Sequence, residues 1–310
     1  MKVLVAGELN VDLVLSGCES FPELGREVLA EGMSLTLGSS SAICAGALAT
    51  LGVPVTFVGR AGCDLWGDLA VSRLSELGVD TGHVIRDAGV PTGITVSISC
   101  SIDRAMVTCL GSIAALTAGD IGVAQFARAG VTHLHVSSYY LQRGLRPGLR
   151  RLFAAAHGAG MTTSLDPGCD PEGMWDREGI LGLLSEVDVF FPNAGELRAI
   201  AGVEDEAEAL RRLSAARVVA AKLGPRGAVV FSRGETLRQE ALPVEPVDTT
   251  GAGDSFNAGF LASWLRDGDA RRALQWGAAC GALSTRGVGG TAALPALAEV
   301  DALLRRPLLA

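Results

Sequence analysis

The 310-residue sequence contains few aromatic and few charged side chains, and its cysteines do not follow a disulfide or zinc pattern. Aromatic residues make up 5% and charged residues 19% of the chain, whereas the hydrophobic fraction is 48%. The seven cysteines are an odd number without a Cys-x-x-Cys pair, which argues against a disulfide framework or a zinc site. We therefore expect a cytoplasmic protein with a large apolar core.

Features that direct proteins to membranes or nucleic acids are also missing. No apolar run is long enough to span a bilayer, and residues 1–8 form a short strand without the longer apolar stretch of a secretory signal. The formal net charge of −8 offers no attraction for nucleic acid or an anionic membrane. We therefore expect a small-molecule partner, with no nucleic acid and no membrane.

Two common nucleotide-binding motifs are absent. The chain has no Gly-x-x-x-x-Gly-Lys-Ser/Thr, and no Gly-x-Gly-x-x-Gly follows its first strand-like segment. A P-loop ATPase and a dinucleotide-dependent oxidoreductase are therefore disfavoured.

Strand-length apolar runs recur along the chain with helical patterns between them. Such alternation predicts an α/β protein with three layers, α/β/α, around a mostly parallel sheet. Ligands gather at the carboxyl ends of such strands, where the sequence places Asn10, Asp166, Asn193 and Gly224. The predicted strands are residues 3–7, 56–59, 133–137, 163–166, 187–192, 218–223 and 228–231.

One region departs from this pattern. Apolar and polar residues alternate over 94–101, and a second strand-like segment follows at 106–110, which predicts a half-buried β-hairpin. Together with residues 13–15 and 28–37, it would form a small sheet apart from the main one. This sheet is either a lid that excludes water from a reaction or an ordinary extension of a sheet edge.

Residues 251–254, Gly-Ala-Gly-Asp, precede an apolar helical segment, and we call them the anion cradle. Glycines let the backbone come close to a ligand, and the first amides of a helix attract phosphate groups. Asp254 in such a place suits a base that removes a proton from an attacking hydroxyl group. The alternative is a turn whose Asp caps the helix.

The longer string from Asp248 to Asp254, Asp-Thr-Thr-Gly-Ala-Gly-Asp, closely resembles the signature of the ribokinase-like (PfkB) carbohydrate kinases. The resemblance implies one ribokinase-like domain over 1–310, with the strands of a β lid inserted at about 12–37 and 93–110. It implies transfer of the γ-phosphoryl group of ATP to a primary hydroxyl of a sugar, with Mg²⁺. Asp254 would be the base, and the amides of Gly251, Ala252 and Gly253 would stabilise the moving phosphoryl group.

Two segments resemble the family's acceptor-binding elements. Asn10 and Asp12 match an Asn-x-Asp whose side chains hold sugar hydroxyls, although an Asp after a strand is often only a turn former. Gly38 and Ser39 stand in the place of a Gly-Gly pair, for which a helix start capped by Ser is the alternative. Ile43 replaces the expected Asn of this element, so the reaction type is better defined than the substrate.

Two further segments resemble the family's nucleotide site. Asn193 and Glu196 match an Asn-x-x-Glu that organises Mg²⁺ through water, although a Glu in a first helical turn is also an ordinary dipole partner. Lys222, Gly224 and Gly227 match a nucleotide loop, for which a tight turn is the alternative.

The resemblance also implies a site for a monovalent cation such as K⁺ at Asp248, Thr250, Gly287 and Gly289. Relatives often dimerise through the lid, so a homodimer is a further expectation. Ala278 stands where some relatives carry an Asn near the adenine base. A nucleoside kinase and a non-catalytic sugar or nucleotide sensor remain alternatives.

The acceptor's charge has its own sequence signal. Sugar-acid kinases tend to carry Asn and Arg after an Asp-Pro pair, whereas Asp166 and Pro167 are followed here by Gly168 and Cys169. The missing Arg argues against an acidic acceptor.

Overall fold

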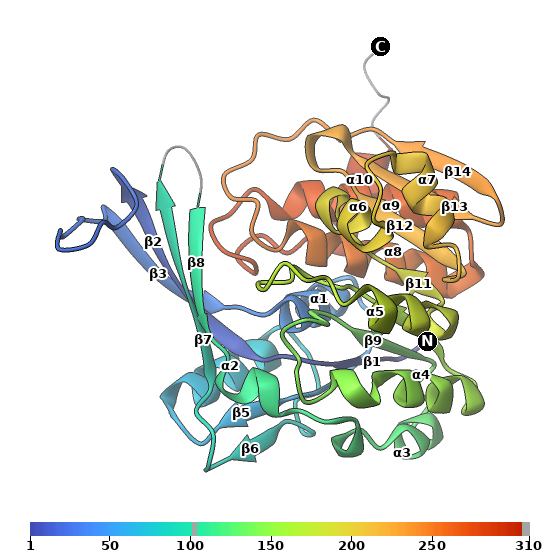
Figure 1. Cartoon of the computed structure of the whole chain (residues 1–310), viewed down its shortest axis with the longest axis horizontal. Coiled ribbons are helices and arrows are strands. Elements are labelled where there is room, and N and C mark those ends of the chain that lie inside the picture. Colours follow the sequence, from blue (N-terminus) through green and yellow to red (C-terminus); the bar gives the residue numbers. More distant parts are fainter. Residues whose placement is uncertain (101–103, 306–310) are drawn as a thin grey trace.

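The computed structural model describes residues 1–100 and 104–305 and consists of a large sheet, two helical layers and a small second sheet (Figure 1). Six neighbouring strands of the large sheet, from β12 to β4, run parallel, and β13 and β14 add antiparallel strands at one edge. In order across the sheet the strands are β14 (Glu235–Gln239), β13 (Ala228–Ser232), β12 (Val218–Lys222), β11 (Val189–Phe190), β10 (Thr162–Leu165), β9 (His133–Val136), β1 (Val3–Ala6) and β4 (Val55–Val58).

Both faces of this sheet are covered by helices, as the runs of buried residues predict. Alternate residues of β1 belong to different cores: Val3 and Val5 pack with α1, α2, α8, α9 and α10, whereas Leu4 and Ala6 pack with the helices α3 to α7. The helices are α1 (Ser40–Thr50), α2 (Leu65–Glu76), α3 (Val123–Arg128), α4 (Leu149–Gly158), α5 (Arg177–Leu183), α6 (Ala194–Ala201), α7 (Glu206–Arg212), α8 (Ala252–Asp267), α9 (Ala270–Ser284) and α10 (Leu297–Leu304).

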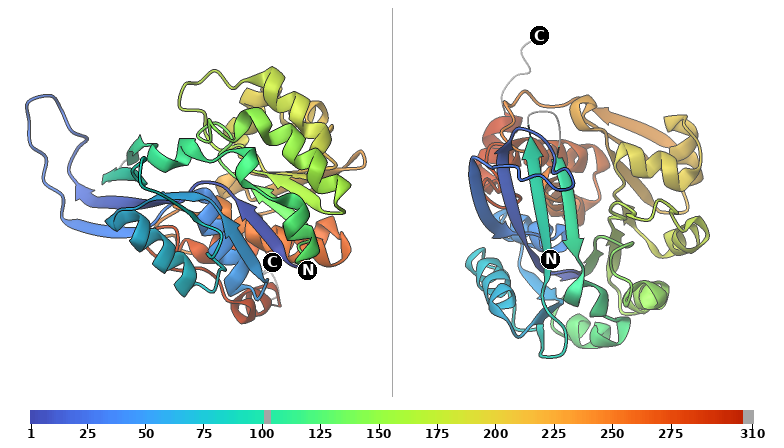
Figure 2. Two further views of the ribbon diagram at one scale, coloured as in Figure 1. Left: turned by 90° about the horizontal axis from the view of Figure 1, so that it is seen from below. Right: turned by 60° about the vertical axis from the view of Figure 1, so that its left-hand side comes forward.

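The small second sheet stands beside the main sheet as a lid (Figures 1 and 2). Its order is β3 (Gly32–Leu37), β2 (Asn10–Cys18), β7 (Gly93–Cys100) and β8 (Arg104–Cys109). β2 pairs parallel with β7, and the other two pairs are antiparallel. The predicted lid is therefore confirmed, and an extension of the main sheet is excluded. β2 is longer than the predicted 13–15, and β3 begins at residue 32 instead of 28.

Smaller elements complete the chain. A two-stranded sheet pairs β5 (Arg60–Gly62) with β6 (Ile85–Asp87). Asp64 caps α2 by accepting from the Gly67 amide at 2.8 Å, and it also accepts from the Thr92 amide at 2.8 Å, directly before β7. The residues around Asp64 therefore join α2 to the base of the lid.

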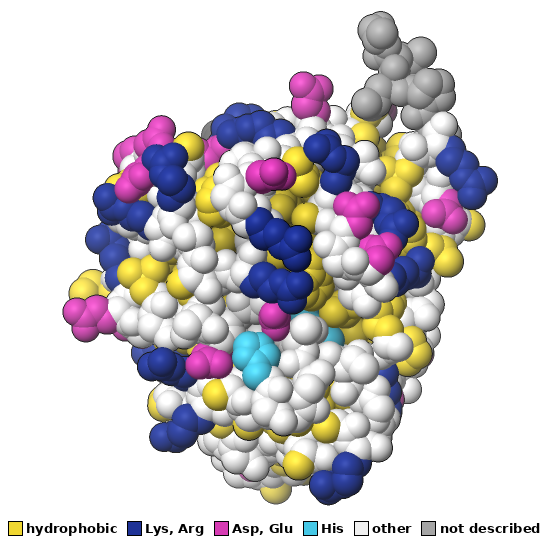
Figure 3. All heavy atoms as spheres, turned by 90° about the vertical axis from the view of Figure 1, so that its right-hand side faces the viewer, with side chains coloured by type: hydrophobic (Ala, Val, Ile, Leu, Met, Phe, Trp, Pro, Cys, Tyr) yellow, Lys and Arg dark blue, Asp and Glu magenta, His cyan; other side chains and the backbone are white. Residues whose placement is uncertain are grey.

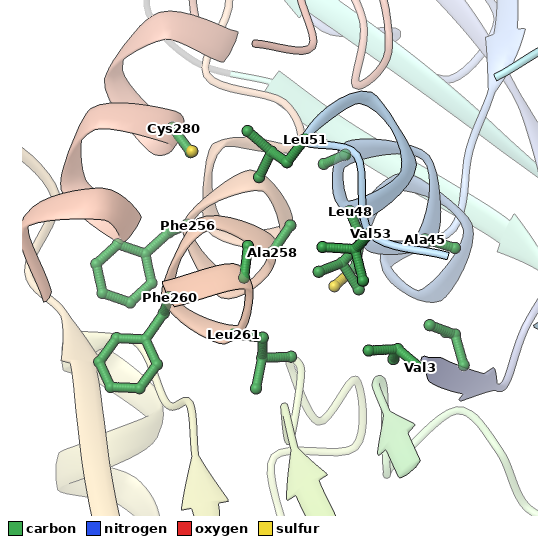
Figure 4. Close-up of a cluster of buried hydrophobic side chains, with 14 of the residues drawn as sticks. Val3, Ala45, Leu48, Leu51, Val53, Phe256, Ala258, Phe260, Leu261 and Cys280 are labelled. Atoms are coloured by element: carbon green, nitrogen blue, oxygen red, sulfur yellow. The ribbon is translucent and has the colours of Figure 1, made fainter. Parts of the chain in front are cut away.

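Close packing holds α8, the helix whose first turn contains most of the anion cradle (Figure 4). Phe256 and Phe260 of α8 stack with ring centroids 6.2 Å apart, and both belong to the buried cluster that also contains Cys280 of α9 and Leu48 of α1. Gly259 allows this approach, because a Cβ there would lie 2.5 Å from the sulfur of Cys280. The start of α8 is thus fixed by the core, as a preorganised site requires.

On the face of the molecule that Figure 3 shows, acidic and basic side chains lie interspersed among apolar and uncharged groups. Within residues 1–100 and 104–305, no helix combines the length and the apolar character that a membrane span needs.

Candidate active site

The lid and the anion cradle enclose a cavity of about 210 Å³. The side chains come from the lid strands, the start of α1, the loop after β9 and the start of α8, so segments that are distant in sequence meet here. The lining residues are Glu8, Asn10, Asp12, Ser39, Ser40, Ile43, Thr95, Arg104, Thr108, Ile113, Ser138, Leu141, Thr250, Gly251 and Asp254.

The anion cradle forms the first turn of α8 and the residue before it. Gly251 has φ 75°, a conformation that favours glycine, and a Cβ there would lie 2.8 Å from the Cα of Gly290. Among the described residues no side chain caps this helix, so its first amides are available to an anion. We predicted that the Ala252 amide would also be available to a phosphoryl group, but it donates to the Thr249 carbonyl at 3.2 Å.

Asp254 lies in the first turn of α8 with its side chain at the cavity. It does not cap the helix, as the alternative interpretation required, because Gly251 occupies the cap position. Burial raises the pKa of Asp254 to about 7, the negative charge of Asp166 adds to this effect, and the positive charge of Lys222 opposes it. A carboxyl group that titrates near neutral pH is suited to accept a proton.

A buried ion pair lies behind the cradle. The Lys222 ammonium group donates to Asp166 Oδ2 at 2.5 Å, and the Asn257 amide group donates to the same oxygen at 2.6 Å. A Cβ built on Gly253 would lie 3.6 Å from Lys222 Nζ, so this ammonium group is adjacent to the cradle. Lys222 is thus close to where a phosphate would bind, as predicted, but Asp166 holds it.

Asn193 and Glu196 form a capping box at the start of α6. Asn193 Oδ1 accepts from the Glu196 amide at 2.9 Å, while the Glu196 carboxylate accepts from the amide of Asn193 at 2.8 Å and from its side chain at 2.6 Å. The backbones of Asn193 and Lys222 form an isolated parallel β-bridge, which places this helix start beside the ion pair. Burial, and next the negative charge of Asp166, raises the pKa of Glu196 to about 7.

Gly224 and Gly227 lie in the turn between β12 and β13. Both take positive φ, 59° and 83°, and a Cβ on Gly227 would lie 2.0 Å from the Gln239 carbonyl. The close approach of the neighbouring strand thus requires Gly227, in agreement with the tight-turn interpretation. Neither glycine lines the cavity.

The predicted acceptor residues meet at the root of the lid. The Asn10 side chain donates to Asp12 Oδ1 at 3.0 Å, and Gly38 is required beside them because a Cβ there would overlap Asp12 Oδ1 at 2.0 Å. Burial raises the pKa of Asp12 to about 6, while Asn10 and Arg104 oppose this effect.

Ser39 and Ile43 serve the structure of the site. Ser39 caps α1 by accepting from the Ala42 amide at 3.1 Å and donates to the Glu8 carbonyl, so the helix-cap interpretation accounts for its side chain. Its φ of 75° explains why the family's pattern has a Gly there. Ile43 is buried against Gly251 and Gly290 and supports the cradle by packing.

Two of the proposed cation-site residues, Thr250 and Gly289, donate hydrogen bonds to the carboxylate of Asp248. Its Oδ1 accepts from the Thr250 amide at 2.9 Å, and its Oδ2 accepts from the Gly289 amide at 2.8 Å. Although burial raises the pKa of Asp248, these hydrogen bonds hold it below its ordinary value, so the carboxylate is charged. Gly287 instead faces Ala292.

The sequence interpretation missed several residues of the site. Glu8 is buried at the cavity and accepts hydrogen bonds from the Ser41 hydroxyl at 2.6 Å and the Ser138 hydroxyl at 2.8 Å. Its place two residues after β1 was a usable signal, because ligands gather at such strand ends. Asn257 had no such signal, since its partner Asp166 is 91 residues away along the chain.

The fold and the site define a phosphotransferase that uses an alcohol group as acceptor. Residues 1–297 match the model of the pfkB family carbohydrate kinase. The chain therefore belongs to the pfkB family of carbohydrate kinases, and it is an ATP-dependent sugar kinase.

Individual relatives agree with this assignment. The chain is 36% identical over 307 residues to the ATP-dependent ribose-1-phosphate kinase of Halopiger xanaduensis, with 98% of each chain covered. Its fold is similar to that of a putative Ribokinase II from E. coli in complex with ATP and Mg²⁺, with a TM-score of 0.86, 25% identity and 99% of each chain covered. A Vibrio cholerae fructokinase bound to fructose, ADP and potassium gives a TM-score of 0.79 at 25% identity over 98% of each chain.

Proposed function

We propose that the protein transfers the γ-phosphoryl group of ATP to a primary hydroxyl group of a sugar, with Asp254 as the general base. The observation that carries this proposal is the shared cavity, which brings Asp254 and the start of α8 together with Asn10 and Asp12. Asn10 and Asp12 hold the sugar hydroxyls, so that the reacting hydroxyl faces Asp254. Asp254 takes its proton as the phosphoryl group is transferred.

The moving phosphoryl group would be stabilised by the start of α8. The amides of Gly251 and Gly253 and the helix dipole favour negative charge there, with a smaller contribution from the Ala252 amide, which is already partly engaged. Lys222 adds a positive charge behind the cradle. Gly224 and Gly227 shape the turn at the end of β12, and we propose that the nucleotide lies along this turn.

A Mg²⁺ ion fits the charge balance of this region. Asp166, Glu196 and Asp254 interact electrostatically with the single ammonium group of Lys222, so carboxylates outnumber the nearby cation. In residues 1–100 and 104–305, no group of three His, Cys, Asp or Glu is arranged to hold a metal by itself. We propose that Asn193 and Glu196 contact the ion through water and that ATP supplies further ligands. When bound, Mg²⁺ neutralises charge on the nucleotide phosphates.

A monovalent cation such as K⁺ has a suitable site at Asp248, whose carboxylate is charged and lies beside Thr250 and Gly289. Carbonyl groups of the loop that contains Gly287 and Gly289 would supply the remaining ligands.

The proposed reaction is tested by measuring ADP release against a panel of neutral sugars, sugar phosphates, sugar acids and nucleosides. A sugar kinase gives acceptor-dependent turnover with at least one sugar. Turnover with nucleosides alone would assign a nucleoside kinase, and ATP binding without turnover on any acceptor would assign a sensor.

Replacing Asp12 with Ala is expected to raise KM for the acceptor by about 10- to 100-fold, the effect of losing one or two hydrogen bonds to a charged group. KM for ATP should change less than about twofold, because Asp12 lies on the acceptor side of the cavity. Steady-state kinetics with each substrate varied in turn measures both values. Asp68→Ala, on the exposed face of α2, is the control, and equal effects on the two KM values would contradict the role of Asp12.

The lid also offers a surface for a second copy of the chain. Its edge strands β3 and β8 expose Met33, Leu35, Met106 and Val107, with exposed fractions from 37% to 72%. Exposed apolar edge strands favour pairing, and we propose a homodimer through this sheet. Met106→Glu should shift sedimentation velocity from dimer to monomer, whereas Met174→Glu, an exposed Met outside the lid, should not. A monomeric wild-type protein would contradict the proposal.

A further inference from the structure

Arg104 carries positive charge from the lid to the acceptor cavity. It is the first residue of β8 and, among the described residues that line the cavity, the only basic one. Its guanidinium group donates to the Thr250 hydroxyl at 2.5 Å and lies 3.8 Å from Asp248 Oδ1. Arg104 therefore reaches from the lid to the residues directly before the anion cradle.

Hydroxyl groups suited to an oxyanion line the same cavity as Arg104. Thr95 and Thr108 of the lid also line the cavity, and their hydroxyl oxygens lie 3.0 Å apart. Together with Thr250, which accepts from Arg104, they supply neutral hydroxyl groups to this cavity. A guanidinium group presents several N–H donors in a planar fork that matches the oxygens of a carboxylate or phosphate.

The acidic groups of the cavity have other partners. Glu8 accepts from Ser41 and Ser138, and Asp12 accepts from Asn10. Asp254 lies at the start of α8, where we propose that it serves as the base. Arg104 and Asp12 both belong to the lid sheet, and the positive charge of Arg104 opposes the rise in the pKa of Asp12, whereas Asp254 belongs to α8.

We propose that Arg104 binds an anionic group of the acceptor, so that the preferred substrate is a monosaccharide that carries a phosphate or carboxylate group. This inference rests on the proposed kinase function. The cavity of about 210 Å³ is below the roughly 300–1,000 Å³ of pockets for larger ligands, which favours a monosaccharide over a nucleoside. The Arg that is missing after Asp166 and Pro167 is thereby replaced by one from the lid.

Matched acceptor pairs test this proposal. Initial rates of ADP formation are measured with ribose and ribose 1-phosphate, and with glucose and gluconate, since both members of each pair carry a primary hydroxyl group. For the wild-type protein we expect kcat/KM to be at least about tenfold higher for an anionic member, the effect of one charge-assisted hydrogen bond. A preference for ribose 1-phosphate alone identifies a phosphate, and a preference for gluconate alone identifies a carboxylate.

Substitution of Arg104 then assigns the preference to this residue. Arg104→Gln should lower the ratio of anionic to neutral kcat/KM by about 10- to 100-fold, and Arg104→Lys should lower it less, because Lys keeps the charge without the fork. Arg26→Gln, in the exposed loop between β2 and β3, is the control and should leave the ratio unchanged. Calorimetric titration with ribose 1-phosphate should show the same order of affinities.

Two results would overturn the proposal: the absence of a wild-type preference for an anionic member, or an equal loss of kcat/KM for both members in Arg104→Gln. The second result would assign Arg104 to the packing of the lid through Thr250. Turnover of neutral sugars without any gain from the anionic group would refute this inference alone. The absence of turnover with every acceptor would instead refute the proposed kinase function.

Discussion

Replacing Asp254 with Asn is expected to lower kcat by about 10²- to 10⁴-fold, the usual contribution of a positioned general base. The amide group has the same shape as the carboxyl group but cannot take the proton of the acceptor hydroxyl. Because α8 is held by core packing around Phe256 and Phe260, the fold and KM for ATP should remain close to wild type. Stopped-time assays of ADP formation at saturating substrates measure the loss.

The pH dependence provides an independent test of Asp254. Its pKa is raised to about 7, so the charged form that accepts a proton predominates above pH 7 and is lost as the pH falls below it. We expect kcat/KM to decrease about tenfold for each pH unit below pH 7. Asp254→Asn should remove the contribution of this group and leave a shallower acid limb, because Glu196, with a pKa also raised to about 7, and Asp12, with a pKa of about 6, still titrate. Near-normal turnover in this variant would refute the assigned role, and Asp68→Asn on the exposed part of α2 is the control.

Removing one partner of the buried ion pair is expected to destabilise the protein by about 3–5 kcal/mol. In Asp166→Asn the buried Lys222 ammonium group loses its hydrogen-bonded carboxylate and keeps only its electrostatic interactions with Glu196 and Asp254, and in Lys222→Met the Asp166 carboxylate stays buried without a cation. The double variant should regain part of the lost stability, because neither member of the Asp166–Lys222 pair is then left charged without the other. Urea unfolding of the four proteins measures these differences.

Activity separates the structural and the catalytic contributions of the pair. If Lys222 also stabilises the moving phosphoryl group, the double variant should be stable yet have kcat lowered by about 10²- to 10³-fold. Arg211→Met, a substitution in an exposed ion pair of α7, should change neither quantity much. Wild-type activity in the stable double variant would limit Lys222 to a structural role.

Most of the main sheet follows from local apolar patterns. All seven predicted runs coincide with strands. Six of these strands are parallel and β13 is antiparallel, but all are largely buried and are therefore nearly continuous apolar segments. β14 was missed since it is a polar edge strand, Glu-Thr-Leu-Arg-Gln, whose pairing with β13 rather than its own pattern makes it a strand. The lid hairpin was predicted because its alternation of apolar and polar residues is itself local.

Local chemistry also explains which parts of the site were predicted. Gly251 and Asp254 are three residues apart in sequence, and the start of α8 that they form depends on glycine conformation and helix geometry. Ser39 shows the limit of such patterns, because its side chain caps α1 where the family's element suggested an acceptor contact. Gly227 is likewise required by its close approach to the Gln239 carbonyl of the neighbouring strand, where a Cβ would not fit.

The amino-acid pattern alone specifies the layered α/β architecture, the lid hairpin and the glycine-framed start of α8, since each depends on residues that are close together in the chain. The packed structure alone brings Asp166 to Lys222 across 56 residues and Arg104 to Thr250 across 146. Such contacts follow from the order of strands in the sheet and from the position of the lid over it, and the spacing of residues along the chain contains neither.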